Sequence, residues 1–374
     1  MKNKRFWLFF GVVVIVAAIV IGFTITQKSS KHIIKIGAIL PLTGQVDIFG
    51  QYIRQGIDLG VEEINNEKRD YKFKVIYEDS KNEAKSGVLA FNKLVNIDKV
   101  NIIISAMSGV SFPLMPLVDK SKIILFMTAV THSDATDRSE WAFRHYINRG
   151  EGAKVLSNYV FNRLNFRKVA LAYINDEGGK GEANSFISEF TKLGGTISIS
   201  EPYNATDLEF RKIVLKIKNT DYDAVYISGY GRTFGIIIKQ IREGRIFKPI
   251  LTGYSVEEKF VQEIVGEALN NVIYYSPAYS ETQGSLSEFQ AKFKKKYGQN
   301  PPDPACGYAF DIIMLLGEAI KKAKSTSSEK IRKGLLEIKD FSGSLGNITI
   351  LPNRDCKTPL IIKKFQNGKG ERIE

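Results

Sequence analysis

Cysteine and histidine are scarce in this sequence. Its 374 residues include only two cysteines, Cys306 and Cys356, and three histidines. Two cysteines exclude a disulfide framework and leave open either a single bridge in an oxidising compartment or two unpaired thiols. The histidines and cysteines do not show the spacing of metal ligands, so we expect no metal site.

The signatures of common enzyme sites are also missing. The sequence contains no GxxxxGK[ST] phosphate loop and no GxSxG nucleophile elbow. A glycine-rich turn from Gly229 to Gly235 follows a predicted strand, but it has one residue too many for GxGxxG and lies far from the first strand. Tyr230 and Arg232 would also crowd a pyrophosphate there. We therefore expect no enzymatic activity, no catalytic residues and no cofactor.

Acidic residues are absent from the first thirty positions, which carry four basic ones. In the rest of the chain the basic residues are scattered among acidic ones, although the formal net charge is +13. Scattered charges of both signs indicate solvated faces rather than a basic patch, so we expect no nucleic-acid binding.

Charged residues are missing from Phe6 to Thr26, a run of 21 residues. As a helix this run is about 31 Å long, which is enough to cross a bilayer, and the basic residues before it predict export of the rest of the chain. No good cleavage site and no lipid-accepting cysteine follow the run. We expect residues 1–32 to form a membrane anchor and short linker, with a cleaved signal peptide as the alternative. Both interpretations, the membrane anchor and the cleaved signal peptide, place the chain after residue 32 outside the cytoplasmic membrane, in the periplasm or at the cell surface.

The rest of the chain alternates short apolar runs with segments of helical period. Strands are predicted at 34–40, 71–79, 100–106 and 123–129, and helices at 50–67, 83–97 and 111–121. Within 50–67, Ile53, Ile57, Val61 and Ile64 form one apolar stripe. Apolar strands joined by helices predict a parallel sheet that is covered on both faces.

The alternation of apolar runs with segments of helical period starts again at Arg167. Further strands are predicted at 167–174, 196–202, 223–229, 248–254 and 271–277, with helices between them and three helices after them. The sequence therefore predicts an α/β protein with two lobes of similar build. In open parallel sheets, ligands bind at the carboxyl ends of the strands, so the loops there are the places to search.

Those loops carry hydroxyl groups beside predicted helix starts, at Thr43, Ser108, Ser111 and Thr131. Hydroxyls and free backbone N–H groups at such positions suit a carboxylate ligand. An ordinary helix cap is the alternative for each of them. Aromatic side chains occupy other loops, at Phe49, Tyr230 and Tyr254, where packing is the alternative to ligand contact.

Several segments in order carry a resemblance to a known family. They are IKIGAILPLTG, FGQYIRQGIDLGVEEIN, IYEDSKNEAKSGVLAFNKLV, DAVYISGYGRTFGIIIKQIREG, FQAKFKKKYGQNPPDPACGYAFDIIMLLGEAIKKA and FSGSLGNITI. From about residue 33 to the end the chain resembles the leucine/isoleucine/valine-binding proteins, the type I periplasmic solute receptors of ABC transporters. The resemblance implies two Rossmann-like lobes joined by a three-strand hinge. The first would comprise 33–145 plus 278–340, and the second 146–277 plus 341–374.

The resemblance also implies a ligand-binding site. Ser108 and Thr131 match the first-lobe hydroxyls that hold the carboxylate and amine of the ligand. Ala129 matches a residue that contributes its backbone carbonyl. Phe49 and Tyr230 match aromatic residues that line the pocket.

Two positions depart from the family pattern. At the position of the family's second-lobe carboxylate, which pairs with the ligand's ammonium group, this chain has Tyr254. At the position of a pocket tyrosine it has Gly178. A tyrosine carries no full charge at neutral pH. Asp176 and Glu177, next to Gly178, are the candidates to compensate. The family's first-lobe disulfide is absent as well.

We therefore expect a protein that binds an amino acid or a similar small polar ligand by clamshell closure and feeds an ABC importer. Its expected partners are the ligand, the permease subunits and the membrane, through the apolar segment. The alternative is a ligand-sensing ectodomain coupled to a signalling partner. A Rossmann-type enzyme is disfavoured by the missing motifs.

Overall fold

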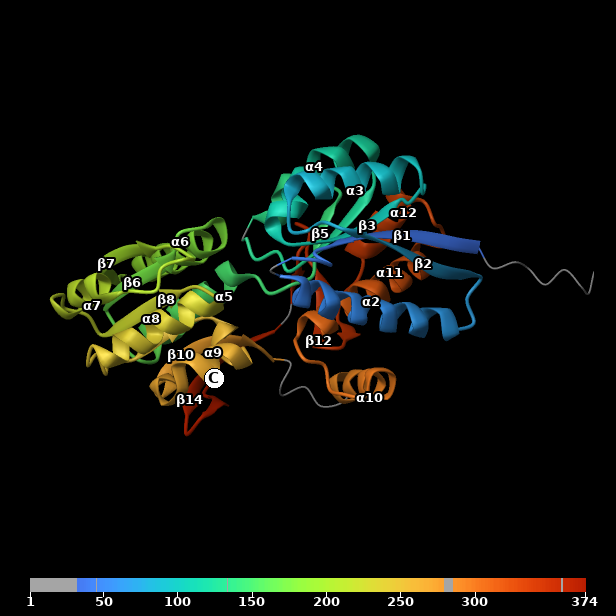
Figure 1. Cartoon of the computed structure of the whole chain (residues 1–374). Coiled ribbons are helices and arrows are strands. Elements are labelled where there is room, and N and C mark those ends of the chain that lie inside the picture. Colours follow the sequence, from blue (N-terminus) through green and yellow to red (C-terminus); the bar gives the residue numbers. More distant parts are fainter. Residues whose placement is uncertain (1–31, 45, 133, 279–284, 358) are drawn as a thin grey trace, which may run out of the picture.

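The computed structural model describes residues 32–374, apart from 45, 133, 279–284 and 358. The predicted anchor at 6–26 lies outside the described residues. Within the described part, no helix is long and apolar enough to cross a membrane. Figure 1 shows two lobes side by side, with the chain passing between them.

The first lobe is built on a five-stranded parallel sheet of order β2-β1-β3-β4-β5. Its strands are β1 (His32–Leu40), β2 (Tyr71–Asp79), β3 (Ile102–Ala106), β4 (Ile124–Thr128) and β5 (Ala142–Arg144). One face packs against α3 (Ala84–Asn96) and α4 (Ser108–Ser121), and the other against α2 (Asp47–Asn66), α11 (Ala305–Ala323) and α12 (Ser328–Leu336). Because both faces are covered, β3 and β4 are buried at every residue, which explains their continuous apolar sequence.

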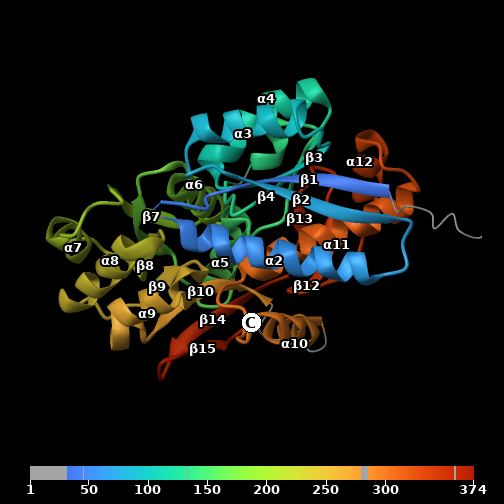
Figure 2. The same ribbon diagram turned by 45° about the vertical axis from the view of Figure 1, so that its right-hand side comes forward.

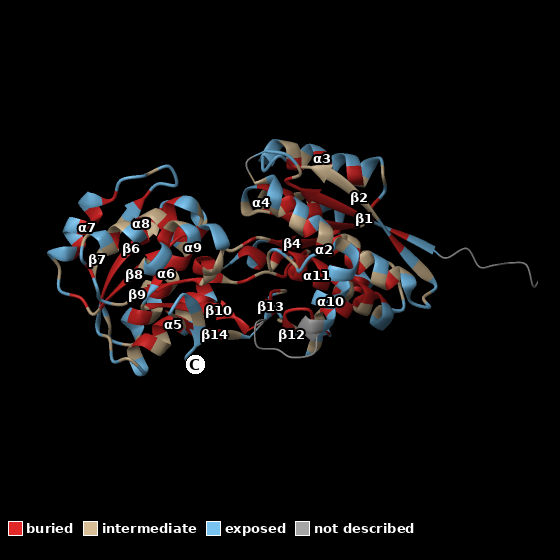
Figure 3. Ribbon diagram, turned by 60° about the horizontal axis from the view of Figure 1, so that its bottom comes forward, coloured by how far each residue is buried: buried red, intermediate tan, exposed pale blue. Residues whose placement is uncertain are grey.

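The second lobe contains a seven-stranded sheet of order β15-β14-β10-β9-β8-β6-β7. Its strands are β6 (Lys168–Ile174), β7 (Thr196–Tyr203), β8 (Ala224–Ser228), β9 (Ile250–Thr252), β10 (Val272–Pro277), β14 (Leu360–Gln366) and β15 (Lys369–Arg372). Helices α5 (Arg149–Asn162) and α6 (Glu177–Lys192) cover one face, and α7 (Arg211–Lys218), α8 (Gly231–Glu243) and α9 (Lys259–Val265) the other. Figure 3 shows the buried strands at the centre of each lobe. The predicted α/β fold with two lobes and parallel sheets is confirmed.

The carboxyl-terminal part of the chain divides between the lobes, as Figure 2 shows. A small antiparallel sheet of β11 (Phe341–Gly343), β12 (Gly346–Ile350) and β13 (Cys356–Lys357) packs into the first-lobe core. Strand β14 instead pairs with β10 of the second lobe. The predicted placement of all of 341–374 in the second lobe is therefore wrong for β11 to β13, because Ile348, Ile350 and Cys356 are buried against α11 and the first sheet.

The chain passes between the lobes after β5, after β10 and between β13 and β14. After the second passage, α10 (Ser285–Tyr297) packs Phe289 and Phe293 against α11 in the first lobe. Cys306 and Cys356 are both buried and unpaired, which settles the choice left open by their number.

Helices α2 and α11 pack closely at Gly56. A Cβ atom placed on Gly56 would lie 2.0 Å from the carbonyl oxygen of Cys306, which is backbone and has no rotamer to change. A glycine in mid-helix is intrinsically unfavourable, so its presence here reflects this close approach.

We expect Gly56→Ala to lower the free energy of unfolding by about 1–3 kcal/mol, because overpacking outweighs the better helix propensity of alanine. The measurement is the urea midpoint at unchanged slope. Gly181→Ala in α6 is the matched control, since no atom lies within 4 Å of the added Cβ; it should be neutral or stabilising. A Gly56→Ala protein as stable as the parent would contradict the packing argument.

Candidate functional site

Sheet topology places the candidate site where the two lobes face each other. In each lobe the first strand lies between its second and third, as β1 lies between β2 and β3 and β6 between β7 and β8. Such a switch in strand order opens a crevice at the carboxyl ends of the strands. Ser108 follows β3 and Thr131 follows β4, whereas Asp176 follows β6 and Tyr230 follows β8. All four predicted or candidate polar residues therefore lie at these strand ends.

The four hydroxyl groups found in the sequence separate into two kinds. Thr43 Oγ1 donates to Asp79 Oδ2 at 2.5 Å, and Ser111 Oγ lies 2.7 Å from Ser105 Oγ in a buried pair. Both hydroxyls are therefore engaged within the first lobe. Ser108 begins α4, whose N-cap makes no side-chain hydrogen bond, and its own hydroxyl has no partner within the described part of the chain.

Polar groups from both lobes converge on Gly178. A Cβ atom at Gly178 would lie 3.2 Å from Thr131 Oγ1, 3.5 Å from Asp176 Oδ1 and 3.5 Å from Tyr230 Oη. Thr131 belongs to the first lobe and the other residues to the second. A hydroxyl, a carboxylate and a phenol thus border the position at which the family resemblance implies a pocket tyrosine.

Asp176 is one of the two acidic residues that could compensate for the missing second-lobe carboxylate. It caps α6, accepting from the Gly179 N–H at 2.8 Å through Oδ1, and the Tyr230 hydroxyl donates to its Oδ2. The second candidate, Glu177, lies at the rim instead. Its side chain is 75% exposed, and its Oε2 lies 3.4 Å from His132 Nε2 of the first lobe. Asp176 is therefore the carboxylate beside Thr131 and Tyr230.

Arg149, which the sequence analysis did not identify, lies behind the two second-lobe tyrosines. It is only 3% exposed, and its guanidinium carbon lies 5.0 Å from the ring centre of Tyr230 and 5.1 Å from that of Tyr254. It donates to Glu182 Oε2 at 3.2 Å, the Gly229 carbonyl at 3.2 Å and Ser255 Oγ at 2.8 Å. The buried ion pair of Arg149 and Glu182 is neutral overall. With these hydrogen bonds, Arg149 holds the rings of Tyr230 and Tyr254 in place.

Tyr254 is a neutral group in this site. Burial is the main cause that raises its pKa to about 12, and its hydroxyl lies 2.9 Å from that of Tyr146 in the first crossover.

Phe49 lies in the first turn of α2, half-buried, with its ring 6.4 Å from that of Tyr52 in an edge-to-face arrangement. Ala129 follows β4 with a φ of 51°, a left-handed conformation that turns the chain out of the sheet ahead of Thr131.

Arg144 fixes the loop that carries Thr131, and it too was missed from the sequence. It is fully buried at the end of β5, and its Nε donates to Asp355 Oδ1 at 2.8 Å while Nη2 donates to Oδ2. Its Nη1 donates to the carbonyls of Val130, at 3.3 Å, and His132. These two carbonyls flank Thr131, so one guanidinium holds the loop on both sides of that residue.

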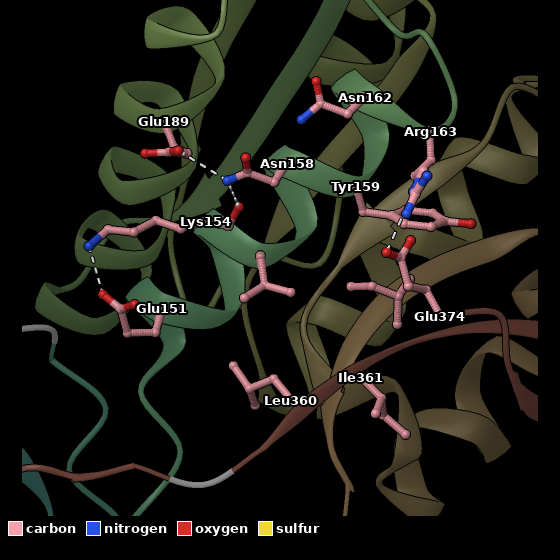
Figure 4. A pocket seen from close by; sticks show the side chains of 12 residues that line it. Glu151, Lys154, Asn158, Tyr159, Asn162, Arg163, Glu189, Leu360, Ile361 and Glu374 are labelled. Carbon is pink, nitrogen blue, oxygen red and sulfur yellow. Dashed lines mark hydrogen bonds and ion pairs between the residues drawn. The ribbon is translucent and has the colours of Figure 1, made fainter.

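A separate hollow of about 670 Å³ lies on the outside of the second lobe, between α5 and β14 (Figure 4). Its charged side chains are already paired, as in Lys154–Glu151 at 2.7 Å and Arg163–Glu374 at 3.6 Å. None of the six predicted site residues lines it. Among the described residues, no cluster of histidine, cysteine and acidic side chains could hold a metal ion.

Comparisons with known proteins show the family to which the chain belongs. The model of the periplasmic binding protein family matches residues 33–367. Leu/Ile/Val-binding protein homolog 3 of Brucella melitensis is 26% identical over 358 residues, which cover 91% of this chain and 94% of that protein.

Two solved structures share the fold. The branched-chain amino acid transporter substrate-binding protein LivJ of Streptococcus pneumoniae, in complex with isoleucine, is 27% identical with a TM-score of 0.78, over 90% of this chain and 97% of that one. A solute-binding protein of an ABC transporter from Rhodopseudomonas palustris, in complex with 3,4-dihydroxybenzoic acid, shares the fold at 22% identity with a TM-score of 0.79, over 91% and 96% of the two chains. The chain belongs to the periplasmic binding proteins of the leucine/isoleucine/valine-binding type, which are solute receptors of transporters and not enzymes.

Proposed function

We propose that this chain is an extracytoplasmic receptor that holds an amino acid, or a ligand with the same polar groups, between its lobes and delivers it to an ABC importer. The observation that carries this proposal is the convergence of Thr131 with Asp176 and Tyr230 around Gly178. A site assembled from two lobes favours a ligand that binds the closed arrangement better than the open one.

The proposed contacts follow from charge. The ligand's carboxylate would lie at the amino end of α4, near the Ser108 hydroxyl and the first N–H groups of that helix. The ligand's ammonium group would contact Asp176, together with the Thr131 hydroxyl and the Ala129 carbonyl. Hydrogen bonds between charged groups are about twice as strong as those between neutral ones. A micromolar receptor needs a net binding free energy of about −8 kcal/mol, which such contacts can supply in a closed cleft.

The closed form is the state that a permease would recognise. The proposed location follows from the family and from the basic, apolar segment ahead of residue 32, which would hold the receptor at the membrane through residues 6–26. The structures of transporter receptors with the same fold favour delivery to a permease over a sensing role.

A ligand screen by thermal shift tests the proposal. The panel comprises amino acids, amides, short peptides and aromatic acids. A true ligand at a hundredfold excess over its dissociation constant stabilises the protein by about 2.7 kcal/mol. We expect an α-amino acid to raise the unfolding temperature. Stabilisation by aromatic acids alone would contradict the proposed contacts.

Removing either hydroxyl should weaken binding without unfolding the protein. We expect Thr131→Ala and Ser108→Ala each to raise the dissociation constant of the amino acid identified by the screen by about 5- to 100-fold, the loss of one hydrogen bond to a charged group. Titration calorimetry measures the effect. Thr43→Ala is the control, because its hydroxyl is bound to Asp79 and its loss should leave affinity unchanged. Full affinity in both site variants would refute the assignment.

Asp176 and Glu177 can be distinguished in the same way. Asp176→Asn keeps an acceptor for Tyr230 but removes the charge, so the affinity for the amino acid should fall at least about tenfold. The affinity for the corresponding 2-hydroxy acid, which has no ammonium group, should change much less. Glu177→Gln serves as control and should have little effect, since that carboxylate is largely exposed. The reverse ranking of the two variants would place the ammonium group at the rim.

A further inference from the structure

His132 and Glu177 form a contact between the two lobes at the rim of the cleft. His132 follows β4 in the first lobe, and Glu177 is the first residue of α6 in the second. The Nε2 atom of the histidine lies 3.4 Å from Oε2 of the glutamate. Each residue is next in sequence to a candidate binding residue, Thr131 or Asp176, so the contact lies beside the proposed ligand site.

This contact requires the lobes to be close together. Gly178, next to Glu177, approaches the first lobe so closely that an added Cβ atom would lie 3.2 Å from Thr131 Oγ1. An ion pair is lost when its atoms separate beyond about 4 Å, so opening the cleft by a few ångströms would break the contact. The contact therefore belongs to the closed arrangement of the lobes, whereas an ion pair within one lobe would persist in both arrangements.

Packing within the first lobe holds the histidine in place. The His132 side chain is only 13% exposed, and its ring meets the uncharged Phe112 ring of α4 edge-to-face, with centres 5.7 Å apart. Its backbone carbonyl accepts from the buried Arg144. Since the imidazole is already fixed, it loses little conformational freedom when it pairs with Glu177, which favours this pair over an ordinary surface ion pair.

A carboxylate faces each nitrogen atom of the imidazole. Nδ1 contacts the carboxylate of Asp134, and Nε2 faces that of Glu177. A neutral imidazole donates from one nitrogen only, so the lone pair of the other nitrogen would face a negative oxygen atom. The protonated ring donates from both nitrogens. The geometry of the closed arrangement therefore suits the protonated ring.

The other charged groups nearby are engaged elsewhere. Arg138 pairs with Asp134 at 3.5 Å, and Arg144 binds the carbonyl of the histidine and not its ring. Asp176 accepts hydrogen bonds within the second lobe. Among the residues that the structure describes, Glu177 is the charged group of the second lobe that pairs with the imidazole.

We propose that His132 and Glu177 form a pH-sensitive latch, which favours closure of the lobes on the ligand when His132 is protonated. Histidine side chains ordinarily change charge between about pH 5 and 8. The latch forms at the acidic end of this range and is lost as the pH rises, so the receptor holds its ligand more tightly in acid. This inference rests on the proposed function, because closure matters only if a ligand is held between the lobes.

Distances across the cleft, measured without ligand on the purified full-length chain, test the latch. Spin labels on Lys120→Cys and Lys192→Cys lie on exposed positions near the far ends of α4 and α6, away from the latch. Ion pairs with an exposed partner contribute little, so the ratio of closed to open molecules should rise about 2- to 5-fold from pH 8 to pH 5.5. This rise should be absent in both His132→Gln and Glu177→Gln.

Glu263→Gln is the matched control for Glu177→Gln. It removes a carboxylate of the second lobe that is similarly exposed and whose ion pair is with Lys259 of the same helix. This variant should keep the full response of the distance distribution to pH.

Ligand affinity gives a second readout. The gain in affinity from pH 8 to pH 5.5, for each amino acid that binds in the thermal-shift screen, should be about 2- to 5-fold larger in the parent than in His132→Gln or Glu177→Gln. Burial raises the pKa of Glu258 to about 7, but this residue is present in every variant, so its titration cancels in the comparison. At pH 8 an ordinary histidine is neutral, so Glu177→Gln remains the control for Asp176→Asn at that pH.

The outcomes separate the latch from the function on which it rests. Distances that do not respond to pH in the parent, or that respond equally in His132→Gln and Glu177→Gln, would overturn the latch and leave the proposed function standing. Failure of every amino acid to bind would refute the proposed function, whereas a pH response lost in both variants would still support the latch.

Discussion

The buried pair of Arg144 and Asp355 is the interaction on which the rest of the site depends. Arg144 ends β5 where the chain first leaves the first lobe, and Asp355 lies just before β13. Asn148 donates to the same carboxylate at 3.1 Å, so the pair also reaches the start of α5. The remaining donors of Arg144 hold the Val130 and His132 carbonyls. The position of Thr131 is therefore coupled to two of the three places where the lobes are joined.

The same crossover contains a second buried arginine with the corresponding role in the other lobe. Arg149 lies five residues after Arg144 and holds Tyr230 and Tyr254 from behind. A buried cation that loses its partner costs about 3–5 kcal/mol, so both pairs are strongly constrained in geometry. The short segment from Arg144 to Arg149 thus positions candidate binding groups in both lobes, and a change in its backbone would move the two halves of the candidate site relative to each other.

Most of the fold could be predicted from the sequence, because parallel strands that are buried on both faces consist of consecutive apolar residues. The prediction for 71–79 coincides with β2, and that for 34–40 lies within β1. Helix α5 was not predicted, since Gly150 and Gly152 interrupt its pattern; a Cβ at Gly152 would lie 2.2 Å from the Tyr275 ring, so this helix packs too closely on β10 for a larger residue. Strand β5 has only three residues, too few for a periodic signal.

The site was less predictable than the fold. The positions of the predicted strand ends indicated Thr131 and Tyr230. The side chains of adjacent residues in a loop point in different directions, so the sequence alone could not distinguish Asp176 from Glu177. Whether a hydroxyl is free, as at Ser108, or engaged, as at Thr43, depends on a partner far along the chain. Arg144 and Arg149 carry no local sign of burial, because their partners lie 211 and 33 residues away.

The central claim is that one ligand is held by both lobes at once, and a distance measured across the cleft tests it most directly. Spin labels on Lys120→Cys in α4 and Lys180→Cys in α6 would report the separation of the lobes, since both positions are exposed and the native cysteines are buried. With a saturating amino acid ligand the account predicts a shorter and narrower distance distribution than without it. An unchanged distribution, with the ligand shown to be bound, would contradict the account.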